Sequence, residues 1–191
     1  MNLPNKLTML RIILIPVMIA VYLFAEAFGV WTYVAMGVIY VVASYTDHLD
    51  GKIARKRNMV TTFGKFMDPL ADKLLVLTAI IILSDASARG LVDLWMPFWV
   101  PIVILARELV VTSIRLVAVG EGTVIAASGL GKAKTALTMA ATIYYFLVLP
   151  WQLHPALNVV GIVLMAGAVA LTLVSGADYF WKNRKTIFAS V

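Results

Sequence analysis

The chain contains no cysteine, only two histidines and few charged residues, which make up 14% of its 191 residues. The absence of cysteine excludes disulfide bonds and thiolate metal sites. No block of polar sequence interrupts the chain, 62% of the residues are hydrophobic, and the mean hydropathy is +0.93. This composition is too apolar for a soluble protein, so we expect one domain, residues 1–191, embedded in a membrane.

Six apolar runs divide the chain, near residues 9–28, 30–47, 66–84, 94–118, 134–153 and 156–177. Each is close to the roughly 20 residues that a helix needs to cross a bilayer. We therefore predict an all-α integral membrane protein with six transmembrane helices. At the start of the chain, Leu7 and Leu10 oppose Lys6 and Arg11, which predicts a short interfacial helix that is capped by Asn5 and continues into the first span.

The basic residues are distributed unevenly between the two ends of these runs. Six alternating spans would place fifteen of the 16 Lys and Arg residues in one half of the protein and only Arg89 in the other. By the positive-inside rule, both termini should be cytoplasmic. The net charge of +6 suits anionic lipid headgroups and phosphate substrates, and no nucleic-acid-binding module is present.

Four of the ten acidic residues lie close together between two apolar runs, namely Asp47, Asp50, Asp68 and Asp72. The i,i+3 and i,i+4 spacings place each pair on one face of a helix. Acidic residues in apolar spans usually face a polar cavity and have a function. Oxygen ligands without His or Cys favour Mg²⁺ or Mn²⁺. Four carboxylates would suffice for two ions, and without cations they would repel one another.

Some of these residues also have plainer interpretations. Pro69 would fit the first turn of a helix with Asp68 as its N-cap, which is a structural role. His48 lies between two proposed ligands, but it points about 100° away from Asp47 around the helix and is better explained as a polar edge residue. Small residues late in the chain allow close helix contacts, either within one subunit or in a dimer: Gly161, Ala166, Gly167, Ala168 and Ala170.

Charges interrupt two of the runs at ends that antiparallel threading brings together. Asp68, Asp72 and Lys73 begin the third run, whereas Arg107, Glu108 and Arg115 lie toward the end of the fourth. The sequence therefore predicts a polar cavity open to the cytosol. Such a cavity would admit a water-soluble substrate from one side and a lipid headgroup from the bilayer.

The pattern D-x2-D-G-x2-A-R-x8-G-x3-D-x3-D is complete here, and it resembles the motif of the CDP-alcohol phosphotransferases. Its fixed positions are Asp47, Asp50, Gly51, Ala54, Arg55, Gly64, Asp68 and Asp72. Similarity to members that make phosphatidylglycerol phosphate extends to further segments: NLPNKLTMLR at the start, REL at 107–109, TSIR ending at Arg115, and GKAKTA at 131–136.

The resemblance implies a role for each motif residue. Asp47 and Asp68 would bridge two Mg²⁺ or Mn²⁺ ions, Asp50 would complete one, and Asp72 would complete the other and accept the proton of the attacking hydroxyl. The small residues of the motif would let the nucleotide approach the backbone, and Arg55 would bind its diphosphate. The expected CDP-diacylglycerol-binding residues are Gly51, Ala54, Arg55, Thr61 and Gly64.

The acceptor is expected to carry a phosphate, because four cations lie near the predicted cavity: Arg107, Arg115, Lys132 and Lys134. The alternative is that the last three are ordinary positive-inside residues. The resemblance implies a bacterial inner-membrane enzyme, a homodimer, that transfers the phosphatidyl group of CDP-diacylglycerol to sn-glycerol 3-phosphate. Two rivals are the same chemistry with another acceptor (serine, inositol phosphate or a lipid alcohol) and a divalent-cation transporter.

Overall fold

The computed structural model describes residues 2–56, 61–120, 125 and 128–187, and the side chains in these ranges except those of residues 48–56, 65 and 185–187. Throughout these ranges the regular structure is helical, as the sequence predicted. The elements are α1 (Leu3–Tyr22), α2 (Ala25–Phe28), α3 (Val30–Lys56), α4 (Thr62–Ala88), α5 (Trp99–Gly120), α6 (Gly129–Leu147), the 3₁₀ turn η1 (Leu149–Trp151) and α7 (Pro155–Ile187).

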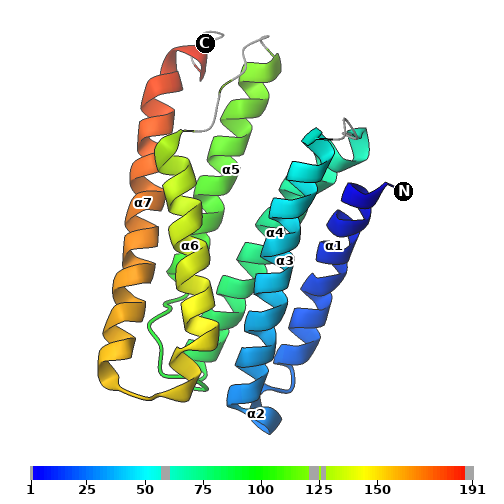
Figure 1. Ribbon diagram of the computed structural model, residues 1–191. Helices are drawn as coiled ribbons and strands as arrows, with labels where there is room; N and C mark the ends of the chain where they lie inside the picture. Colours follow the sequence, from blue (N-terminus) through cyan, green and yellow to red (C-terminus); the bar gives the residue numbers. More distant parts are fainter. Residues whose placement is uncertain (1, 57–60, 121–124, 126–127, 188–191) are drawn as a thin grey trace.

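The six long helices run alternately up and down (Figure 1). α1, α3 and α4 pack together, α5 and α6 both pack on α7, and contacts between α3 and α6 and between α4 and α5 join the two groups. Both chain ends lie at one end of the bundle, where α3 ends and α4 begins (Figure 1). We call this the motif end, and the other, which carries α2 and η1, the opposite end.

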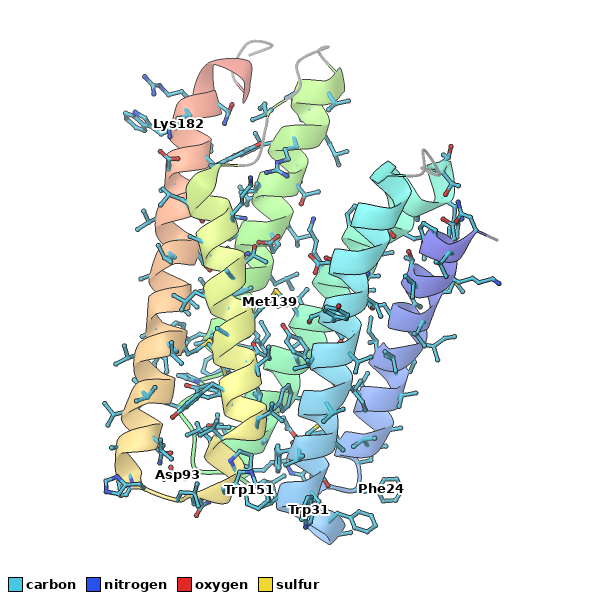
Figure 2. The ribbon with its side chains drawn as sticks, viewed as in Figure 1. Phe24, Trp31, Asp93, Met139, Trp151 and Lys182 are labelled. Atoms are coloured by element: carbon cyan, nitrogen blue, oxygen red, sulfur yellow. The ribbon has the colours of Figure 1, made fainter. Side chains whose placement is uncertain are left out.

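Three helices among the described residues are long and apolar enough to cross a membrane: Leu3–Tyr22, Gly129–Trp151 and Pro155–Arg184. α3, α4 and α5 are of comparable length, with 27, 27 and 22 residues. Aromatic residues at the opposite end include Phe24, Trp31 and Trp151 (Figure 2), and the Trp31 and Trp151 rings meet edge to face at 5.5 Å. Such aromatic residues are typical of a membrane–water interface.

The first helix is continuous, as expected, but has a different cap from the one predicted. α1 runs from Leu3 to Tyr22, and its N-cap is Asn2, whose side chain accepts from the Asn5 backbone N–H. The proposal that Asn5 caps the helix was wrong. Arg11, expected on a polar outer face, is fully buried, because that face of α1 packs against α3 and α4 rather than facing the interface.

The start of α4 also excludes one of the structural alternatives. The N-cap is Thr61, whose Oγ1 accepts from the Gly64 backbone N–H at 3.0 Å, and Pro69 lies inside the helix. Asp68 is therefore not an N-cap. Its side chain is left for the interaction with α1 that is described below.

Two of the small residues of α7, Gly161 and Gly167, serve contacts within the chain. A Cβ on Gly161 would lie 2.5 Å from Cε1 of Tyr145, and one on Gly167 would lie 3.3 Å from a Leu137 methyl group. Both neighbours belong to α6. Packing within one subunit therefore accounts for these two glycines.

Candidate active site

One face of α1 contacts two carboxylates of the aspartate motif, those of Asp47 and Asp68. Nη1 of Arg11 lies 2.9 Å from Oδ1 of Asp47, which comes from α3. The Thr8 hydroxyl, three residues earlier, donates to Oδ1 of Asp68 on α4. Because residues three apart share a face of a helix, α1 reaches both motif helices with neighbouring side chains. The two halves of the motif are thus connected through the first helix.

The first turn of α4 lies beside these contacts. The Thr61 hydroxyl donates to Oδ1 of Asn5 at 2.9 Å. A Cβ on Gly64 would lie 3.3 Å from Oγ1 of Thr61, 3.4 Å from Oδ1 of Asn5 and 3.5 Å from Oδ2 of Asp68. Gly64 therefore permits a close approach to Asp68. Thr61 and Gly64, two predicted nucleotide-binding residues, thus lie close to Asp68. The Thr61 hydroxyl is hydrogen-bonded to Asn5 of α1 and to the Gly64 backbone of α4.

Asp72, the proposed proton acceptor, lies one helical turn further into the bundle. It lines a small cavity together with Lys73, Glu108, Lys134 and Thr135, among others. The charges that act on its carboxylate include those of Asp47 and Arg11 on one side and of Glu108 and Lys134 on the other. Asp72 thus stands between the aspartate motif and the cations of α5 and α6.

Three of the four motif aspartates, Asp47, Asp68 and Asp72, have described side chains. Among the described side chains, no three His, Asp or Glu residues form a group that could hold a metal ion. Asp50, Gly51, Ala54 and Arg55, like His48, have side chains outside the described set. The donor chemistry of the described residues fits a hard cation, since Asp47, Asp68 and Asp72 offer only carboxylate oxygens and Asp47 and Asp72 interact electrostatically.

A second, larger cavity of about 440 Å³ opens beside Asp72 among α4, α5, α6 and α7. Arg107, Arg115 and Lys132, three of the four cations predicted for the acceptor, line it. The fourth, Lys134, lines the smaller cavity. Lys73, Glu108 and Thr135 line both, so the two cavities adjoin. The structure therefore brings these four cations to two adjoining cavities, the smaller of which is lined by Asp72.

Glu108 engages two of the predicted cations. Its Oε1 accepts from Nη1 of Arg107 at 3.0 Å and from Nζ of Lys134. Arg107 also donates from Nη2 to Oγ of Ser175 at 3.0 Å. These groups are largely buried, and buried charges are stable only when they are paired and hydrogen-bonded. Arg107 and Lys134 are therefore fixed around a carboxylate.

Arg115 is held differently, by an aromatic residue of α7. Its Nε donates to the Tyr179 hydroxyl at 3.0 Å, and its guanidinium carbon lies 5.3 Å from the centre of the same ring. Lys73 donates from Nζ to the Thr112 hydroxyl. Neither Arg115 nor Lys73 has a carboxylate within salt-bridge distance among the described side chains, so the positive charge of each is available to an anionic ligand.

The sequence assigned no role at this site to Thr8, Arg11, Lys73 or Glu108. It did place two of them among the charges of the predicted polar cavity. Lys73 and Glu108 are ionisable residues inside apolar runs, and such residues usually face a polar cavity. For Thr8 and Arg11 the three-residue spacing was visible, but nothing in the sequence indicates which helix that face contacts.

The sequence pattern of the CDP-alcohol phosphatidyltransferase family matches residues 1–174. The chain is 42% identical to CDP-diacylglycerol–glycerol-3-phosphate 3-phosphatidyltransferase of Bacillus subtilis, over 99% of this chain and 98% of that protein. It is 40% identical to a probable phosphatidylglycerophosphate synthase of Mycobacterium tuberculosis, over 93% of this chain and 79% of that protein. It is 33% identical to the CDP-diacylglycerol–glycerol-3-phosphate 3-phosphatidyltransferase of Escherichia coli, over 93% of this chain and 92% of that protein. The resemblance seen in the motif is confirmed, and the chain belongs to the CDP-alcohol phosphatidyltransferase family.

Proposed function

We propose that this protein transfers the phosphatidyl group of CDP-diacylglycerol to sn-glycerol 3-phosphate, giving phosphatidylglycerol phosphate and CMP. The observation that carries the proposal is the cationic cavity beside Asp72, lined by Arg107, Arg115, Lys132 and Lys73. A phosphorylated acceptor fits a cavity with this charge. The names of the relatives in B. subtilis and E. coli state the same donor and acceptor.

In the proposed reaction, the acceptor phosphate binds Arg115, Lys132 and Lys73, which orients its hydroxyl end toward Asp72. The hydroxyl oxygen attacks the phosphorus attached to diacylglycerol, the bond from that phosphorus to the CMP oxygen breaks, and Asp72 takes the hydroxyl proton. Holding the two reactants in this geometry removes much of the entropic barrier. Glu108 keeps Arg107 and Lys134 in place, and all other motif residues serve the donor.

Members of this family generally use divalent metal ions. Asp47, Asp50, Asp68 and Asp72 would hold two Mg²⁺ or Mn²⁺ ions, which when bound would neutralise the diphosphate and stabilise the departing CMP. Gly51, Ala54 and Arg55 would bind the nucleotide beside them. The all-oxygen donor set supports this assignment.

The alternation of six helices supports six spans with both termini and the active site in the cytoplasm. Arg89, the one cation assigned to the other side, lies at the opposite end and pairs there with Glu26. Bacterial relatives support the inner membrane as the location. A single domain is supported by the family match over residues 1–174. A homodimer remains part of the proposal.

The experiment that tests this function is acceptor-dependent CMP release by the purified protein. With CDP-diacylglycerol and magnesium, we expect release with sn-glycerol 3-phosphate and none with serine, inositol phosphate or a lipid alcohol. Release with a different acceptor alone would assign the chain to a sister activity. Metal flux into proteoliposomes without CMP release would instead support a divalent-cation transporter.

A further inference from the structure

Three side chains on one face of α1 contact the aspartate motif in order. Asn5 accepts from Thr61 at the start of α4, Thr8 donates to Asp68, and Arg11 pairs with Asp47 at the end of α3. Thr8 is 1% exposed and Arg11 is 0% exposed. The positions differ by three residues, which places them along one side of the helix. α1 therefore supports both motif helices.

Arg11 is unusual because it is a fully buried cation that faces carboxylates expected to bind metal. Its charge acts on Asp72 as well as on Asp47. Burying a guanidinium is costly unless it gains a well-placed anion. Conversely, clustered carboxylates repel one another when no cation is present. Arg11 and the motif thus each compensate for an unfavourable charge on the other.

We propose that Arg11 is a positioning residue that acts as a resident cation: it holds the Asp47 carboxylate in place against α1 before divalent ions bind. Thr8 orients Asp68 in the same way, through a hydrogen bond and without a charge. The inference rests on the metal site of the proposed function. It adds that the site is assembled in the metal-free protein because one positive charge belongs to the chain itself.

The test compares thermal unfolding of the full-length protein in detergent, with EDTA and with increasing magnesium. In EDTA, the midpoint of Arg11→Met should lie about 5 °C or more below that of the wild type, because Asp47 loses its buried partner. The magnesium-induced rise in Tm should be roughly twofold larger than in the wild type, since carboxylates without a resident cation gain more from an ion that binds only the folded state.

Two further variants separate charge at this site from general effects. Arg11→Lys keeps a positive charge in the same place, so its magnesium-induced rise should lie between those of the wild type and Arg11→Met. Arg89→Met removes an arginine that pairs with Glu26 at the opposite end. Any loss of Tm that it causes should be the same with EDTA and with magnesium.

Equal magnesium-induced rises in Arg11→Met and the wild type would overturn the proposal. If Arg11→Met cannot be purified, Arg11→Lys provides the same test. The proposal is overturned if Arg11→Lys has a lowered Tm in EDTA but a magnesium-induced rise in Tm equal to that of the wild type. These measurements need no substrate. A wild type that responds to magnesium as described but releases no CMP would refute the proposed reaction and leave the role of Arg11 standing.

Discussion

Replacing Arg115 by Gln should weaken binding of the acceptor while leaving donor binding unchanged. Arg115 lines the larger cavity, and its guanidinium is oriented by the Tyr179 hydroxyl at 3.0 Å and by the ring beneath it. A hydrogen bond to a charged group contributes about 1.5–3 kcal/mol. Since each 1.4 kcal/mol is a factor of ten, the KM for sn-glycerol 3-phosphate should rise about ten- to hundred-fold.

The assay is the initial rate of CMP release against acceptor concentration, at saturating CDP-diacylglycerol and fixed ionic strength. A control is Lys182→Gln, which removes one positive charge from the same end of the bundle, where Lys182 lies on α7 and pairs with Asp178 (Figure 2). Lys182 does not line either cavity beside Asp72. Its acceptor KM should stay near that of the wild type, because exposed charges at a distance are screened by salt.

Arg115→Lys should recover only part of the affinity, because an ammonium lacks the planar fork that binds phosphate and stacks on the Tyr179 ring. An unchanged acceptor KM in Arg115→Gln would refute the assignment of this cavity to the acceptor phosphate. Equal increases in Arg115→Gln and Lys182→Gln would show that surface potential, rather than a direct contact, attracts the acceptor.

Three further predictions concern the metal site, the topology and the packing. Asp47→Asn should abolish CMP release while circular dichroism shows a folded protein; near-normal release would contradict the two-metal site. A single cysteine can be introduced into this cysteine-free chain. At position 129 it should be protected from an impermeant thiol reagent in intact cells, whereas at position 154 it should react. The reverse pattern would show that the predicted orientation is wrong. Gly161→Ala should destabilise the protein by about 1–3 kcal/mol in thermal unfolding, because the new Cβ would lie 2.5 Å from Tyr145. Gly129→Ala should be nearly neutral, because a Cβ there would have no neighbour within 4 Å. Equal stabilities of the two variants would argue against the α6–α7 contact.

The sequence by itself determined the class of the fold and the family to which the chain belongs. Apolar runs of nearly membrane-spanning length predicted the long helices, although their ends shifted: the run near 94–118 becomes a helix only at Trp99. Motif spacing placed Asp68 and Asp72 on one face of α4. The position of charges within the runs predicted a polar cavity between the third and fourth runs, and Arg107 and Arg115 line a cavity that adjoins the one lined by Asp72.

Only the tertiary structure decided which of these charges pair with one another. Lys6 and Arg11 look equivalent in the sequence, yet Lys6 is exposed whereas Arg11 is fully buried against Asp47. Likewise, Arg107 and Lys134 were expected to bind phosphate, and both are engaged by Glu108. Helical periodicity reports which residues share a face of one helix. It does not report which helix that face meets, and for a buried charge the neighbouring helix determines whether it binds a ligand or supports another residue.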